Sequence, residues 1–199
     1  VDVIQEEAGE DLMALGGVSD SDLRSSLVAT VQSRFLWLLV NLLTAVIASL
    51  VIGVFDETIE RLVALAVLMP IVASMGGNAG TQTVTVAVRA LAMRQLTDAR
   101  IVNRFVLREA MVGLTNGLIF AVVAGVVTLI WFQNIQIALV MGFAMIANML
   151  AAALSGAGIP IILSKMKIDP AVASSVFITT VTDVIGFLTF LGLAAIYLV

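Results

Sequence analysis

The chain has 199 residues, of which 61% are hydrophobic and 12% are charged. A soluble domain carries about 25% charged residues, so this composition excludes an ordinary soluble domain and indicates an integral membrane protein. The sequence contains no cysteine and no histidine, which excludes disulfides, thiolate metal sites and imidazole ligands. Any bound metal must be held by oxygen atoms, which favours hard cations such as magnesium or calcium.

Residues 1–33 are polar and hold seven of the fourteen acidic residues. Their acidic start and the lack of an apolar core argue against a signal peptide. Residues 6–15 are predicted to form a short acidic helix that ends at Gly16 and Gly17. We expect residues 1–33 to be a cytoplasmic connecting region, the tail of a larger soluble region, and residues 34–199 to be the membrane domain.

Five apolar segments follow, and we predict that each is a transmembrane helix. They cover residues 35–55, a second stretch that starts near residue 59, and residues 110–132, 135–163 and 171–199. All but the second are long enough to cross a bilayer alone, because about 20 apolar residues span the hydrocarbon core. The predicted fold class is an all-α integral membrane protein with five transmembrane helices.

The basic residues indicate an orientation in the cell membrane. Nine of the ten precede the first segment or lie between the second and third or the fourth and fifth segments; Arg61 is on the other side. By the positive-inside rule, the N-terminus is expected in the cytoplasm and the C-terminus outside. An odd number of spans agrees with that result.

The second segment contains Pro70 and then a glycine-rich stretch at 76–82 (Gly-Gly-Asn-Ala-Gly-Thr-Gln). This composition predicts a broken helix, and irregular backbone at membrane depth persists only where it is buried in protein or faces water. Freed carbonyl groups, with the amides of Asn78 and Gln82, could coordinate a hydrated cation. The alternative is a kinked packing helix or the cytoplasmic end of the span.

Two features at the start of the third segment are interpreted as structural. Gly113 and Gly117 form a GxxxG pattern, which usually marks close helix packing. Glu109 beside Arg108 predicts an ion pair at the cytoplasmic edge of the membrane.

Asp183 is the ionisable residue of the last segment and is the main candidate for function. It lies about twelve positions into the segment, ~18 Å along a helix, near the middle of a bilayer. A carboxylate at that depth costs on the order of 3 kcal/mol or more, so a functional role is the default interpretation. Thr179, Ser175 and Gly186 share its helix face and form a small, hydroxyl-bearing stripe that we interpret as lining a water-accessible path.

The counter-charge of Asp183 is expected to come from outside the protein. No lysine or arginine lies inside a predicted span, so a permeating cation is the economical partner. The alternative is a protonated carboxyl group hydrogen-bonded to a neighbouring threonine, Asn116 or Asn148. No HExxH, GxSxG or paired acid–base arrangement is visible, so an enzyme is disfavoured, and no nucleic-acid partner is expected.

The stretch from Pro70 to Gln82 and the sequence Thr-Thr-Val-Thr-Asp-Val-Ile-Gly-Phe around Asp183 resemble the transmembrane domain of the MgtE family of magnesium channels. The resemblance covers essentially the whole chain. It implies a homodimer in the lipid bilayer, with a pore on the two-fold axis that is lined mainly by the second and fifth spans. Asp183 then binds the hydrated magnesium ion, with candidate contributions from Thr179, Ser175, Asn78 and Gln82.

The same resemblance implies regulation. Full-length members carry a cytosolic N-terminal domain and CBS domains, which this chain lacks, joined to the membrane domain by a connecting "plug" helix. Regulatory magnesium bound among cytoplasmic acidic residues closes the channel. Asp169 on the loop before the fifth span, and Glu6 and Glu10 on the plug helix, are the positions expected to take part.

Two other functions stay open on the sequence. A secondary carrier with Asp183 as a proton relay is compatible with a broken second span, although no convincing internal repeat is found. In a non-transporting membrane subunit, Asp183 would merely guide assembly.

Overall fold

The computed structural model describes residues 26–199, apart from the side chains of Ser33, Val172, Ala173 and Ser175. In this part of the chain five helices are long and apolar enough to cross a membrane. They are α2 (Leu27–Gly53), α4 (Ala64–Ala92), α5 (Ala99–Phe132), α6 (Ile135–Lys165) and α7 (Pro170–Tyr197), with a short helix α3 (Asp56–Arg61) after α2. The predicted all-helical fold with five helices suited to span a membrane is therefore confirmed.

The start of the chain is covered only in part. Most of the predicted connecting region, with its short acidic helix, lies outside the described residues. Helix α2 begins at Leu27, where Ser26 caps it by accepting the N–H of Ala29. The last residues of the expected connecting region are therefore continuous with the first span.

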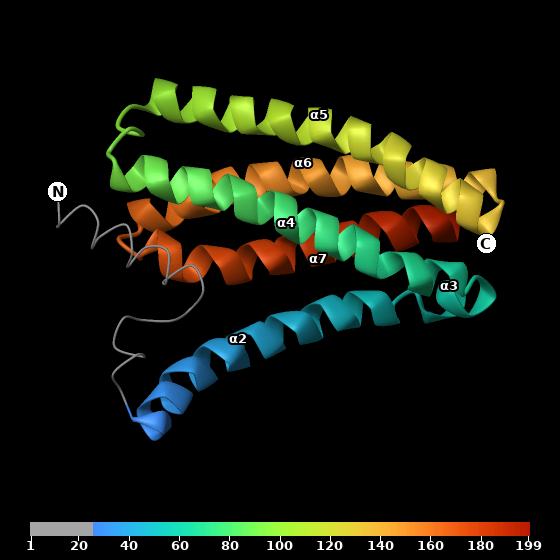
Figure 1. Ribbon diagram of the computed structural model, residues 1–199, viewed down its shortest axis with the longest axis horizontal. Coiled ribbons are helices and arrows are strands. Elements are labelled where there is room, and N and C mark those ends of the chain that lie inside the picture. The colour runs from blue at the N-terminus through green and yellow to red at the C-terminus, as the bar shows by residue number, and fades with distance from the viewer. Residues whose placement is uncertain (1–25) are drawn as a thin grey trace.

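The long helices lie side by side, so their connections gather at two ends (Figure 1). One end holds the connections from α4 to α5 and from α6 to α7, and we call it the arginine-rich end. Its basic residues after α2 are Arg89, Arg94, Arg100, Arg104, Arg108, Lys165 and Lys167. Helix α3, with Arg61, is at the opposite end.

Helix α6 is the centre of the bundle and packs against α4, α5 and α7. Its contact with α5 depends on Gly113 and Gly117, which are both buried. A Cβ atom at Gly113 would lie 2.4 Å from the Cβ of Ala153, and one at Gly117 would lie 3.1 Å from the Cα of Ile146. The first distance is shorter than real Cβ contacts and the second is tighter than most of them, so the close packing predicted from the GxxxG pattern is confirmed.

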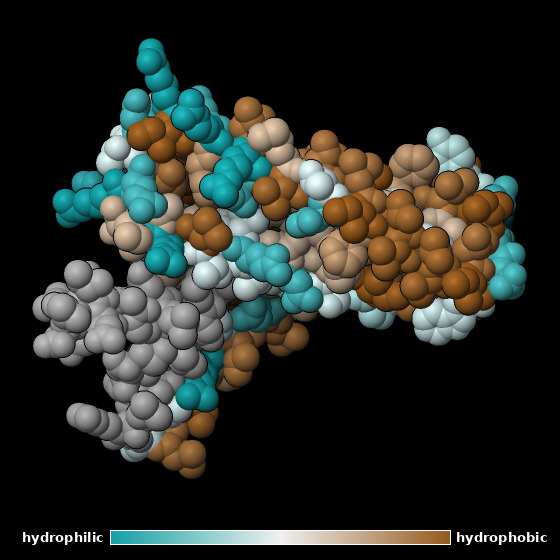
Figure 2. Space-filling view, turned by 45° about the horizontal axis from the view of Figure 1, so that its top comes forward, coloured by the Kyte–Doolittle hydropathy of each residue, from teal (hydrophilic) through white to brown (hydrophobic). Residues whose placement is uncertain are grey.

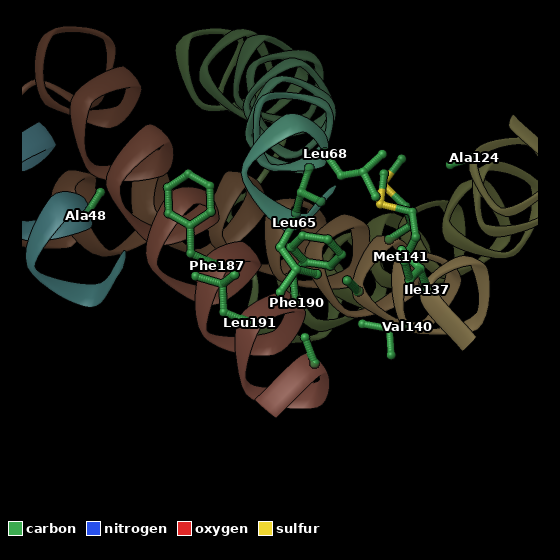
Figure 3. Close-up of a cluster of buried hydrophobic side chains, with 14 residues drawn as sticks. Ala48, Leu65, Leu68, Ala124, Ile137, Val140, Met141, Phe187, Phe190 and Leu191 are labelled. Carbon is green, nitrogen blue, oxygen red and sulfur yellow. The ribbon is translucent and has the colours of Figure 1, made fainter. Parts of the chain in front are cut away.

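Large apolar side chains of α4, α6 and α7 form the main core near the opposite end (Figure 3). Leu65, Leu68, Met141 and Phe190 in this cluster are fully enclosed. Towards the arginine-rich end a second, smaller cluster is made by Val84, Val88, Ala171 and Ile178. The main core therefore fixes α4, α6 and α7 as a unit.

Helix α2 packs mainly on α7 and leans away from the bundle towards its N-terminal end (Figure 1). Ala48 is the residue of α2 that is buried among those described. Apolar side chains also cover much of the outer surface of the bundle; in Figure 2, hydrophilic residues gather mainly at the arginine-rich end and reach the middle of the face shown, with a few more at the opposite end. An apolar belt between polar ends is what a lipid bilayer requires of a protein surface.

Helix α4 is continuous, which corrects the predicted break in the second span. Its 29 residues include Pro70 and the whole glycine-rich stretch. Pro70 lies near the start of the helix, where it removes one backbone hydrogen bond without ending the helix. Gly76 and Gly80 allow close approach to other helices, as shown below, whereas Gly77 faces open space. The predicted freed carbonyl groups are therefore not present.

Candidate cation site

Asp183 lies near the middle of α7, which has 28 residues. The helix rise places it roughly 20 Å from the N-terminal end of α7, at the depth of a bilayer centre. Its side chain is half-buried, and within residues 26–199 no hydrogen bond or ion pair engages its carboxyl group. The hydrogen-bonded alternative, with Asn116 or Asn148 as partner, is therefore not what the structure has.

Only part of the predicted stripe on α7 is accessible from the surface. Thr179, one turn before Asp183, is exposed. Thr182 is buried and donates to the backbone oxygens of Ile178 and Thr179 at 3.0 and 3.1 Å. Gly186 is also buried, and Ser175 occupies a matching helix position, although its side chain is outside the described part. Thr179 is thus the described hydroxyl that shares the accessible side of α7 with Asp183.

Helix α4 presents a row of exposed polar side chains, which we call the α4 polar stripe. The stripe consists of Ser74, Asn78, Thr81, Gln82 and Thr85. Asn78 donates to Ser74 Oγ at 3.5 Å, and the hydroxyls of Thr81 and Thr85 donate to backbone oxygens one turn earlier at 2.9 and 2.8 Å. The amide and hydroxyl oxygens of these residues remain able to accept hydrogen bonds from a hydrated ion.

The orientation of the stripe follows from the glycines on the opposite side of α4. A Cβ atom at Gly76 would lie 2.3 Å from Asn148 Nδ2, and one at Gly80 would lie 2.3 Å from Ile178 Cγ2. These two glycines therefore bring α4 close to α6 and α7. The polar side chains consequently project from the bundle, where a spanning helix ordinarily presents apolar residues to lipid.

Asn78 and Gln82 do not occupy one site with Asp183 in the single chain. Asn78 pairs within its own helix, and Gln82 lines a cavity of about 210 Å³ between α4, α5 and α6. Asp183 is not among the residues that line this cavity. The structure therefore places the amides and the carboxylate on neighbouring helices without bringing them together.

The same cavity contains a functional candidate that the sequence interpretation missed. Glu109 of α5 is 8% exposed and lines the cavity with Gln82, Thr83 and Asn116. Among the described residues it makes no ion pair with Arg108, so the predicted interfacial pair is wrong. The spacing of Glu109 to Gly113 and Gly117 could have revealed this, because residues four apart share a helix face.

Of the three residues predicted to bind regulatory magnesium, the structure describes only Asp169. Asp169 is exposed and caps α7, since its Oδ1 accepts the backbone N–H of Ala171 at 2.8 Å. Glu6 and Glu10 lie outside the described residues. Within the described range there is no group of three or more acidic side chains able to enclose a metal ion. Among the described residues, Asp183 therefore lacks the further carboxylates that a closed metal site needs, and it can attract a cation that keeps most of its water.

Comparison with known proteins gives consistent results. A family model described as a divalent cation transporter, MgtE, matches residues 69–193. Three proteins named magnesium transporter MgtE are similar to the chain: 32% identical over 198 residues in Enterococcus faecalis, 33% over 200 in Bacillus subtilis and 34% over 201 in Thermus thermophilus. Each alignment covers 100% of this chain and 44% of the relative, so the chain spans less than half the length of these relatives.

Proposed function

Because this chain belongs to the MgtE family of divalent cation transporters, we propose that it forms the pore of a magnesium channel. Hydrated Mg²⁺ enters the cytoplasm through the pore and binds transiently at Asp183. The observation that carries the proposal is the half-buried carboxylate at mid-span, which has no hydrogen-bond or ion-pair partner within residues 26–199. An unpaired carboxylate at that depth is costly unless a cation visits it.

A homodimer supplies the second half of the site. Two copies related by an axis beside α7 place two Asp183 carboxylates across one pore, a charge of about −2 for one divalent ion. The α4 polar stripe supports this arrangement, because its amides and hydroxyls would face the water-filled axis in place of lipid. Mg²⁺ sheds water reluctantly, so Thr179, Ser175, Asn78 and Gln82 would contact its hydration shell.

The proposed orientation places the arginine-rich end in the cytoplasm. All basic residues that follow α2 lie at this end except Arg61. The positive-inside rule assigns such an end to the cytoplasm, which leaves the C-terminus of α7 outside.

Gating by cytosolic Mg²⁺ is the second part of the proposal. Regulatory Mg²⁺ bound among Asp169, Glu6, Glu10 and acidic residues of the cytosolic domains would favour a closed state. These 199 residues alone supply only part of that set, so we expect a protein made of them alone not to close at millimolar cytosolic Mg²⁺. Patch recording of the chain beside a full-length family member tests the point. Equal inhibition by Mg²⁺ would place the gate and its sensor within these residues.

Flux through purified protein in liposomes separates the channel from its two rivals. A channel passes Mg²⁺ under a membrane voltage alone, and the current follows the voltage at constant pH on both sides. A carrier with Asp183 as proton relay would require a proton gradient or would move protons with each ion. A non-transporting subunit would give no uptake above that of empty liposomes, and that result would refute the proposal.

A further inference from the structure

Asn148 is a buried polar residue at the point where α4, α6 and α7 meet. Its side chain is 1% exposed, and its Nδ2 donates to the backbone oxygen of Val72 on α4 at 2.7 Å. Because a carbonyl oxygen accepts and cannot donate, this contact fixes the orientation of the amide. The flipped amide would place two oxygen atoms at that distance.

Two glycines press against the same amide from different helices. A Cβ atom at Gly76 of α4 would lie 2.3 Å from Asn148 Nδ2, and one at Gly186 of α7 would lie 2.8 Å from it. Both distances are shorter than real Cβ contacts, so a larger residue at either position would displace the Asn148 amide. Gly76 is within one turn of Asn78, and Gly186 is within one turn of Asp183. The amide therefore lies at the level of the candidate site.

Stability alone does not account for an amide at this junction. Asn148 Oδ1 is fully enclosed and has no hydrogen-bond partner within the described residues. A buried acceptor without a donor costs free energy, whereas leucine has nearly the same shape and leaves no such atom. Leucine differs in one geometric respect. Its methyl carbon stays about 3.3 Å or more from a carbonyl oxygen, so it holds α4 farther from α6 than the amide does.

We propose that Asn148 is a positioning residue for transport. Its amide on α6 is hydrogen-bonded to α4 and packs against Gly186 of α7. It therefore sets the distance between α4 and α7, and with it the spacing between the α4 polar stripe and Asp183. The inference rests on the proposed function, because the spacing between the helices affects transport only if Mg²⁺ passes through the pore.

The test compares the wild-type chain with Asn148→Leu and with a matched control, Asn41→Leu. Asn41 also lies in a spanning helix, but its Nδ2 donates to the backbone oxygen of Trp37 in the same helix at 2.9 Å. Loss of this amide therefore breaks no contact between helices. Three quantities are measured: the unfolding temperature in detergent, the Mg²⁺ flux in liposomes, and the distance between spin labels on α4 and α7. Labels replace Val86 and Phe177, which are 50% and 52% exposed, in chains diluted into unlabelled protein.

Asn148→Leu is expected to unfold at the same or a higher temperature, to lengthen the mean distance between the labels, and to lower the Mg²⁺ flux roughly tenfold. Asn41→Leu should change neither the distance nor the flux. An unchanged label distance in Asn148→Leu overturns the inference, and so does a fall in flux that only follows the loss of folded protein. If the wild-type chain carries no Mg²⁺, the proposed function fails and the label distance alone decides the positioning role.

Discussion

Asp169 illustrates at the residue scale how a carboxylate near the membrane surface can serve the fold directly. Its side chain accepts the N–H of Ala171 and begins α7, which carries Asp183. An aspartate in this position satisfies one of the free N–H groups of the first turn and interacts favourably with the helix dipole. A contribution to Mg²⁺ sensing would be additional to this capping role.

Substitutions at Asp169 should therefore separate capping from charge. We expect Asp169→Ala to lower the free energy of unfolding by about 1 kcal/mol, because the cap is lost. Asp169→Asn should remain near the wild-type value, because the asparagine oxygen caps equally well. Denaturant unfolding in detergent measures both variants. A loss in Asn as large as that in Ala would show that the charge, and not the cap, holds the residue in place.

Glu109 is a second carboxylate whose surroundings allow a prediction. It is buried beside Gln82 and Asn116, and no basic residue lines its cavity. We expect Glu109→Gln to leave the unfolding temperature unchanged or to raise it, because the variant removes a buried carboxylate that has no ion-pair partner within residues 26–199 and so relieves a desolvation cost. Thermal unfolding of the two proteins at neutral pH is the measurement. A clear drop in the variant would reveal a cationic partner for Glu109 in the protein.

At the scale of helices, the two adjacent glycines of α4 have different surroundings. A Cβ atom at Gly76 would collide with the Asn148 amide, whereas one at Gly77 would meet nothing within 4 Å. We predict that Gly76→Ala lowers both the unfolding temperature and the Mg²⁺ flux, and that Gly77→Ala, the matched control, changes neither. Introducing Asn148→Ala should partly rescue Gly76→Ala by making room. Equal effects of the two glycine substitutions would contradict this account of α4.

The sequence predicted the spans well because hydrophobicity over some twenty residues is a local signal. It predicted the role of 76–82 wrongly because a glycine that breaks a helix and a glycine that admits a neighbour have the same local pattern. The neighbour that explains Gly76 is Asn148, which is hydrogen-bonded to Val72 although the two residues are 76 positions apart in the sequence. Gly113 and Gly117 were interpreted correctly because their spacing is itself a packing signal.

The candidate site was predicted in part for similar reasons. Asp183 stands out as a charge inside an apolar segment, and no partner elsewhere in the chain was needed to find it. Glu109 was assigned to Arg108 because the two are adjacent in sequence, yet adjacent residues on a helix do not face each other. The local pattern that does indicate its burial is the four-residue spacing to Gly113 and Gly117, which places Glu109 on the face of α5 that packs against α6.

At the scale of the whole molecule, the α4 polar stripe predicts where water enters the membrane domain. The chain has no cysteine, so single cysteines can be introduced without a background. We expect a membrane-impermeant thiol reagent to modify Thr85→Cys on the stripe in liposomes. It should not modify Val123→Cys on α5, which is 50% exposed but apolar in its surroundings. Equal protection of both cysteines would mean that lipid or protein, and not water, covers the stripe.

Mg²⁺ uptake by liposomes containing Asp183→Asn tests most directly whether Mg²⁺ binds at Asp183 as it crosses the membrane. The asparagine keeps the size of the side chain and removes its charge. The matched control is Asp98→Asn, an exposed residue before α5 whose side chain makes no capping hydrogen bond. We predict that Asp183→Asn reduces uptake by at least about tenfold, since a pore that selects dications needs the charge, while Asp98→Asn matches the wild type. Undiminished uptake by Asp183→Asn, in correctly folded protein, would contradict binding of Mg²⁺ at Asp183.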